Sequence, residues 1–178
     1  MAVDVLDRAL RREPDLGSRG PRLALVTVGS SILKIGLHSA AGRLREALAR
    51  VSRSPGVFWV EYQALTDIMN FYKSDPVREC GLEPTGRPII RRVRISHMLE
   101  PDNYRRVRRN FYRLHCQFVS GNDRRAIYDY FMLVCGPLSV EQQAQLREGA
   151  TLQFGDDGRL LHAAPSADDG RTHLTLLR

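Results

Sequence analysis

The chain has 178 residues, of which 43% are hydrophobic and 26% charged, so it fits one globular domain rather than a disordered segment. Its apolar runs fall well short of the roughly 20 residues that a membrane-spanning helix needs. The amino terminus begins Met1-Ala-Val-Asp-Val and lacks the basic start and apolar core of a signal peptide. We therefore predict a cytoplasmic protein with no transmembrane segment.

The net charge of +7 raises the hypothesis of nucleic-acid binding. The basic residues are 25 arginines and two lysines, scattered apart from dense runs at 91–94 and 105–113. Scattered charge is typical of a solvated surface, and nucleic acid is therefore the less favoured partner. The three cysteines (Cys80, Cys116 and Cys135) are far apart and form no CxxC motif, so we expect buried, reduced thiols and no metal or cofactor.

The first half of the chain predicts a strand–helix–strand unit. After an amphipathic helix at 2–13, the run 22–29 is almost continuously apolar, as in a strand buried on both faces of a parallel sheet. Ser39 is placed to cap a helix at 40–52, and 57–62 is a second apolar strand. This order is typical of a βαβ crossover.

The second half predicts a third strand at 89–96 and a further strand at 128–135. Between them, Pro101 starts a helix whose buried stripe would hold Tyr104, Val107, Phe111 and Leu114. Ser139 and Gln142 have the spacing of a capping box. We assign residues 1–149 to the main domain and 150–178 to a peripheral hairpin or tail, flexible after Ala163, with its turn at 156–158.

Motifs that would identify an enzyme directly are absent from the sequence. It contains no Gly-rich phosphate loop, no HExxH, no EF-hand loop and no Gly-x-Ser-x-Gly nucleophile motif. Val28-Gly-Ser-Ser31 comes nearest, with serines after a strand, but Leu33 stands where the second glycine would be. We interpret Ser30 and Ser31 as loop or cap hydrogen-bonding residues.

Several phrases nevertheless resemble the C-terminal half of a bacterial α/β-hydrolase of the lipase or esterase type, over roughly residues 2–140. They are Thr-Val-Gly at 27–29, Trp-Val-Glu-Tyr at 59–62 with Asp67 beyond it, Phe-Tyr-Arg-Leu-His-Cys-Gln-Phe at 111–118, and Tyr-Asp-Tyr-Phe at 128–131. The resemblance implies an α/β fold: a partial parallel sheet with flanking helices. It also implies a serine-hydrolase mechanism acting on an ester or lipid-like small molecule.

In that family the nucleophile, the acid and the histidine follow one another along the chain. The resemblance implies that Asp67 is the acid and His115 the base; His97 is the alternative base, because it follows a predicted strand. An interpretation without catalysis also stands: Asp67 lies between Thr66 and Asn70 and could form a turn or a helix cap.

Under the resemblance, the helix at 2–13 would directly follow the nucleophile turn, so we expect a chain that is incomplete and inactive on esters as given. The alternative function is a non-enzymatic binding module that uses its arginine-rich surface for nucleic acid or an acidic partner. A third hypothesis is self-association through an exposed sheet edge.

Overall fold

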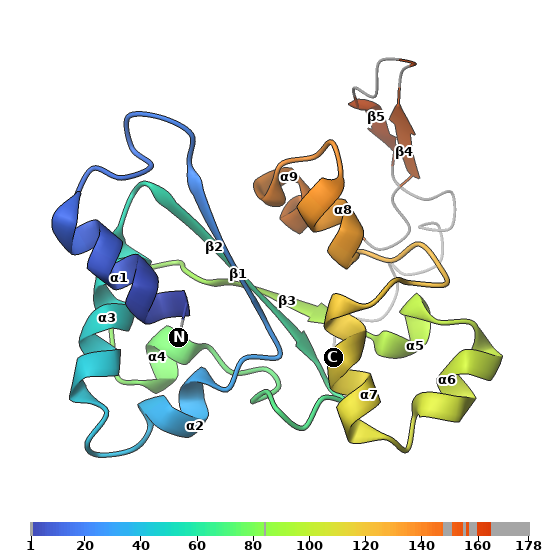
Figure 1. The fold of residues 1–178 in the computed structure, drawn as a ribbon, viewed down its shortest axis with the longest axis horizontal. Helices are drawn as coiled ribbons and strands as arrows, with labels where there is room; N and C mark the ends of the chain where they lie inside the picture. The colour runs from blue at the N-terminus through green and yellow to red at the C-terminus, as the bar shows by residue number, and fades with distance from the viewer. Residues whose placement is uncertain (1, 84, 148–150, 155, 157–159, 165–178) are drawn as a thin grey trace, which may run out of the picture.

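A computed structural model of the protein describes residues 2–83, 85–147, 151–154, 156 and 160–164 (Figure 1). Its main sheet has three parallel strands in the order β1-β2-β3, with Val26 of β1 opposite Val60 of β2, and Val60 opposite Ile89 of β3. The strands are β1 (Leu23–Val28), β2 (Val57–Ala64) and β3 (Ile89–Val93). The predicted open parallel α/β arrangement is therefore confirmed.

Short helices flank the sheet along the whole described chain. They are α1 (Ala2–Arg12), α2 (Ile32–Gly36), α3 (Gly42–Arg53), α4 (Pro76–Glu79), α5 (Ile95–Met98), α6 (Pro101–Val107), α7 (Phe111–Cys116), α8 (Tyr130–Cys135) and α9 (Val140–Gln145), with a 3₁₀ turn η1 (Gln117–Val119) after α7. Figure 1 shows α1 to α4 on one side of the strands and α5 to α9 on the other. Among the described helices, none combines the length and apolar character needed to cross a membrane.

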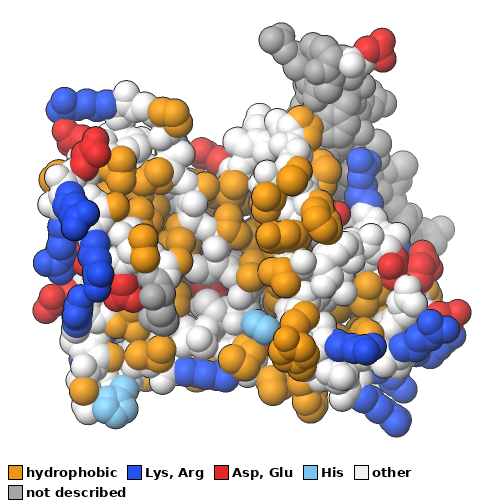
Figure 2. All heavy atoms as spheres, in the orientation of Figure 1, with side chains coloured by type: hydrophobic (Ala, Val, Ile, Leu, Met, Phe, Trp, Pro, Cys, Tyr) orange, Lys and Arg blue, Asp and Glu red, His pale blue; other side chains and the backbone are white. Residues whose placement is uncertain are grey.

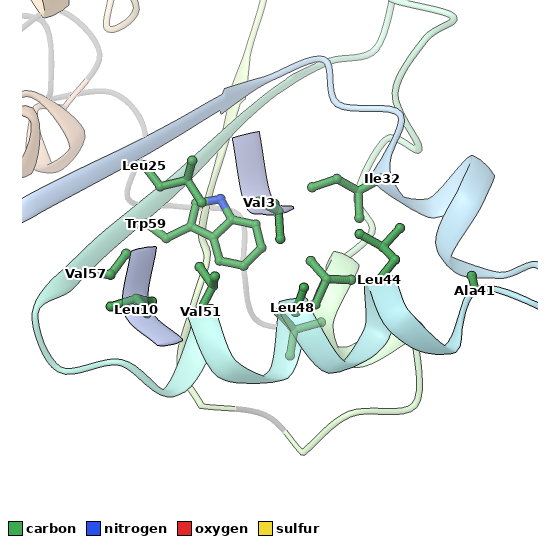
Figure 3. Close-up of a cluster of buried hydrophobic side chains, with 12 residues drawn as sticks. Val3, Leu10, Leu25, Ile32, Ala41, Leu44, Leu48, Val51, Val57 and Trp59 are labelled. Atoms are coloured by element: carbon green, nitrogen blue, oxygen red, sulfur yellow. The ribbon is translucent and has the colours of Figure 1, made fainter. Parts of the chain in front are cut away.

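The two faces of the sheet bury separate hydrophobic cores. On one face, Trp59 of β2 and Leu25 of β1 pack with Leu48 and Val51 of α3 and Val3 of α1 (Figure 3). The other face packs β2 against the second half of the chain, with Phe58, Val60, Tyr62 and Ala64 facing Leu114, Phe118 and Tyr128. All eight residues of β2 are buried, as expected of the central strand of a covered parallel sheet.

A buried acid ties α1 to α3. The Asp7 carboxylate, 6% exposed, accepts hydrogen bonds from Nε of Arg50 on α3 and Nε of Arg11 on α1. Burial opposes the charged form of Asp7, but the hydrogen bonds from the two guanidinium groups outweigh it and lower the pKa of the carboxyl. This contact supplies a directional link beside the apolar packing of α1.

Three predicted elements of the second half need correction. Residues 128–135 form no strand: Asp129 accepts a hydrogen bond from the Met132 amide and so begins helix α8. The single helix expected from Pro101 is two helices, because Asn110 caps a new one, α7, by accepting from the Arg113 amide. Phe111, expected in the buried stripe, is 55% exposed. The third strand ends at Val93, where α5 follows, rather than at Ser96.

In the first half, Ser39 does not cap the helix that follows it. Helix α3 begins at Gly42, and the residue before it is Ala41, which offers no side-chain cap. Arg45 instead donates to the carbonyls of Gly36, His38 and Ser39, which ties the loop before α3 to the helix.

The C-terminal features agree with the sequence where they are described. Ser139 and Gln142 form the expected capping box at the start of α9. Strands β4 (Thr151–Phe154) and β5 (Leu160–Ala164) pair antiparallel as a hairpin. Most of its turn lies outside the described residues, and so does the tail expected to be flexible after Ala163, except for Ala164, which ends β5.

Replacing Asp7 with Asn keeps the side-chain shape but removes the charge that binds Arg50 and Arg11. We expect a loss of about 1 kcal/mol in the free energy of unfolding at neutral pH, because both guanidinium partners are partly exposed. The folded-state pKa is lowered, so this stabilisation is present above the ordinary value of 3.8 and is lost as the pH falls through the folded-state pKa. Urea unfolding of the wild type and of Asp7→Asn, from acid to neutral pH, measures this difference in stability. Equal stability of the two proteins at neutral pH would contradict a stabilising role for the Asp7 ion pairs.

Candidate functional site

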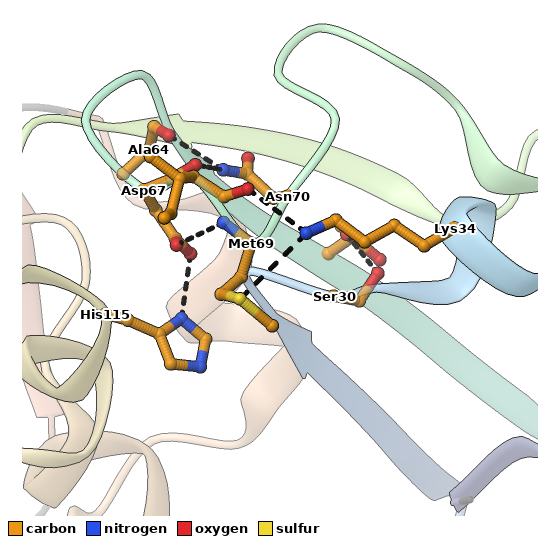
Figure 4. A network of polar contacts seen from close by, with 9 residues as sticks. Ser30, Lys34, Ala64, Asp67, Met69, Asn70 and His115 are labelled. Atoms are coloured by element: carbon orange, nitrogen blue, oxygen red, sulfur yellow. Dashed lines mark hydrogen bonds and ion pairs between the residues drawn. The ribbon is translucent and has the colours of Figure 1, made fainter. Parts of the chain in front are cut away.

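The candidate site lies where β1 and β2 end, at the carboxyl edge of the sheet. Ligands and catalytic groups gather at this edge in open α/β sheets. The loop after β2 carries Asp67 and is held in place by several hydrogen bonds. Asn70 donates to the carbonyls of Ala64 (2.9 Å) and Asp67, and the Lys34 ammonium donates to the carbonyl of Ile68 (3.3 Å) (Figure 4).

Asp67 uses its two carboxylate oxygens for two different tasks. Oδ1 accepts from the Met69 amide at 2.8 Å, which closes an Asx-type turn. Oδ2 lies 3.0 Å from Nδ1 of His115 on α7. Asp67 therefore forms the turn and pairs with the histidine at the same time. The turn fixes the orientation of the carboxylate, so that Oδ2 points at the imidazole.

The two partners differ in their access to solvent. The Asp67 side chain is fully buried, whereas the His115 side chain is 35% exposed. A carboxylate only accepts hydrogen bonds, so the contact requires the hydrogen on Nδ1 of the imidazole and leaves Nε2 with a lone pair in the neutral ring. Figure 4 shows Nε2 on the side of the ring that faces away from Asp67. The pair thus has the arrangement of a general base whose orientation is set by a buried acid.

Helix α7 holds His115 in position through its buried side. Leu114 and Phe118 are each 1% exposed and belong to the core beneath the helix. Asn110 fixes the start of α7 through its hydrogen bond to the Arg113 amide, at 3.0 Å. These anchors place the imidazole over the end of β1.

Gly29, directly after β1, makes the close approach of Asp67 and His115 sterically feasible. Its φ is +50°, in the left-handed region that favours glycine. A Cβ atom at this position would lie well inside contact distance of Asp67 Oδ2 and 3.2 Å from His115 Nδ1. Sequence reasoning missed this residue, although a glycine immediately after an apolar strand was a usable signal.

A second buried acid, Glu61, lies beside the site and accepts a hydrogen bond from the nearby Ser30. Glu61 of β2 accepts from Ser30 Oγ and from Thr27 Oγ1, each at 2.7 Å, and Trp59 Nε1 donates to the same threonine oxygen at 3.0 Å. Burial raises the pKa of Glu61, and the hydroxyl hydrogen bonds only partly oppose that effect. Ser30 is therefore a hydrogen-bond donor to Glu61, as the sequence interpretation has it.

The other candidate residues lie elsewhere. His97 is on α5 and lines a hollow with Tyr72, Arg92 and Arg94, whereas Asp67 pairs with His115. Cys80 and Cys116 are half-buried and Cys135 is exposed, so the expectation of three buried thiols is wrong. Within the described residues, no group of three or more His, Cys, Asp or Glu side chains is arranged to hold a metal ion.

Comparisons with known proteins do not identify a family for this chain: no family model, no curated protein and no solved structure matches it.

Replacing Gly29 with Ala should destabilise the protein by about 1–3 kcal/mol, because alanine is strained at this φ and its Cβ displaces the Asp67 carboxylate from its partners. The matched control is Gly42→Ala on α3, where a Cβ meets nothing within 4 Å and the helix should become slightly more stable. Denaturant unfolding of both variants measures the difference. If the Gly29→Ala protein is as stable as the control, the contact of Asp67 and His115 with the backbone at Gly29 is not as close as the structure shows.

Replacing Glu61 with Gln should change how stability depends on pH. The folded-state pKa of Glu61 is raised, so its favourable contribution is complete below the ordinary value of 4.5 and is lost as the pH rises through the folded-state pKa. The wild type should therefore lose stability relative to Glu61→Gln between acid and neutral pH. A constant difference in unfolding free energy across that range would contradict the raised pKa.

Proposed function

We propose that Asp67 and His115 are the acid and the base of an acyl-transfer site of the α/β-hydrolase type, acting on carboxylic esters. The observation that carries this proposal is the contact of the buried Asp67 Oδ2 with Nδ1 of a half-exposed histidine at the carboxyl edge of a parallel sheet. In such a site Nε2 takes the proton of a hydroxyl nucleophile as the hydroxyl attacks the ester carbonyl, and later gives it to the leaving alcohol.

The acid supports this chemistry in two ways. Its hydrogen bond holds the imidazole in the tautomer whose Nε2 can accept a proton, and its negative charge stabilises the imidazolium that forms during the reaction. Because the turn formed by Asp67 and Met69 also fixes the carboxylate, little reorganisation is needed when the charge develops.

The nucleophile is the component that the described contacts do not supply. Among the described residues, the His115 imidazole has one hydrogen-bond partner, Asp67, and Ser30 donates its hydroxyl hydrogen to Glu61 instead. Our proposal is therefore that the chain as given carries the acid–base half of the site and has no esterase activity by itself.

Hydrolysis of p-nitrophenyl butyrate tests the proposal. The purified 178-residue chain should be no faster than its own His115→Gln variant. When an added alcohol supplies the hydroxyl nucleophile, the chain should transfer the butyryl group to that alcohol with release of p-nitrophenol, and Asp67→Asn should lower this rate by about 10²-fold or more, because the amide favours the wrong imidazole tautomer while still accepting from Met69.

His97→Gln is the matched control in the same assay, since His97 lies on α5 and Asp67 pairs with His115. Its rate should stay close to that of the wild type. Acyl transfer to the alcohol that survives Asp67→Asn, or that is lost in His97→Gln alone, would contradict the assigned roles.

A further inference from the structure

Large hydrophobic side chains stand exposed around the Asp67–His115 pair. Of the exposed large hydrophobic residues in the described chain, six lie on the two segments that carry the pair, and Leu65 and Tyr112 are 72% and 77% exposed. We call these six the apolar face: Leu65, Ile68, Met69, Phe71, Phe111 and Tyr112. Large exposed apolar patches mark interaction sites rather than ordinary solvated surface.

Hydrogen bonds and helix geometry place three of these residues, Phe111, Tyr112 and Met69, beside the Asp67–His115 pair. Phe111 and Tyr112 precede His115 by four and three positions on α7, so they lie on the same side of the helix as the imidazole. The Met69 amide is bonded to the carboxylate that pairs with that imidazole. Figure 2 shows hydrophobic side chains gathered over α7 and α8 on this side of the molecule.

Uncompensated positive charge borders the apolar face. Five arginines lie between 105 and 113, whereas α6 and α7 contain a single acid, Asp102, which pairs with Arg105. The other four are exposed and make no ion pair within the described part of the chain: Arg106, Arg108, Arg109 and Arg113. Figure 2 shows basic side chains next to the hydrophobic ones, over α6 and α7.

From this combination we infer that the apolar face docks onto an anionic phospholipid surface. Aromatic side chains insert at the level of the head groups, and arginines beside them bind lipid phosphates. A protein partner without acidic groups would account for the apolar residues but would leave the four arginines without a function. An anionic membrane accounts for both.

Docking in this orientation directs the exposed edge of His115 towards the lipid, since Phe111 and Tyr112 flank it on α7. The docking itself does not depend on catalysis, because none of its residues is Asp67 or His115.

Co-sedimentation of the full chain with vesicles tests the inference. The protein should bind vesicles made of phosphatidylcholine and phosphatidylglycerol in equal parts, should bind less to phosphatidylcholine alone, and should lose binding as salt is raised. Phe111→Ser with Tyr112→Ser should weaken binding about tenfold or more, since both side chains leave the lipid interface.

Matched controls come from surfaces away from the loop after β2. Val5→Ser with Ile89→Ser removes two exposed apolar side chains, one on α1 and one at the amino end of β3, and should leave binding unchanged. Arg108→Gln with Arg109→Gln should weaken binding, whereas Arg43→Gln with Arg53→Gln on α3 should not.

Two results would overturn the inference: no binding to the anionic vesicles, or equal losses in the test and control variants. A third contradicting result could come from sedimentation equilibrium without lipid. If the wild type is a dimer and Phe111→Ser with Tyr112→Ser is a monomer, the apolar face binds a second copy of the chain instead of a membrane. Asp67→Asn and His115→Gln should bind vesicles like the wild type, so failure of the catalytic proposal and failure of the docking proposal are separable.

Discussion

Every side chain of β2 is buried, and the two faces of the strand are chemically different. One face places Phe58, Val60, Tyr62 and Ala64 in an apolar core. The other places Val57 and Trp59 in the second core and carries Glu61 and Gln63 among polar partners. A shift of one residue in the register of β2 would move Glu61 into the apolar core without its hydroxyl donors, at a large cost in free energy. The register of β2 is therefore fixed by more than hydrophobic burial, and the position of everything after Ala64 depends on it.

The candidate site inherits this fixed geometry. Asp67 follows β2 by three residues, Gly29 follows β1 by one, and the Gly29 amide donates to the Tyr62 carbonyl at 2.9 Å. The end of β1 is thereby held beside β2, and glycine leaves the space in which the Asp67 carboxylate meets the imidazole. The polar contacts of the loop then hold the buried Asp67 carboxylate against the imidazole of His115.

Local sequence signals were sufficient for the parts of the fold that depend on local physics. The continuous apolar runs predicted β1 and β2, and Ser139 with Gln142 predicted the start of α9. The same reasoning was wrong for α8, because an aromatic and β-branched segment satisfies the preferences of a strand, while its helix depends on Asp129 as a cap. Asn110 likewise divides a predicted helix into α6 and α7, and an asparagine before an apolar segment was the overlooked signal.

The site itself could not be predicted from periodicity or spacing. Asp67 and His115 are 48 positions apart, and their contact depends on how α7 packs over the end of β1. Only a family resemblance suggested that pair, with His97 as the alternative base, and the structure brings His115 to the acid. Gly29 shows why the sequence does not predict the site: this glycine matters because it leaves space for Asp67 and His115, which are far away in the chain.

The central claim is that Asp67 orients His115 with a free lone pair on Nε2. Nitrogen-15 NMR of the full chain labelled at histidine measures this directly, with the His115 signals assigned by comparison with His115→Gln. The account predicts that, in the neutral ring, the hydrogen of His115 is on Nδ1 and exchanges slowly with water, and that Nε2 carries none. A neutral His115 with its hydrogen on Nε2 would contradict the account, because that nitrogen could not then accept a proton from a nucleophile.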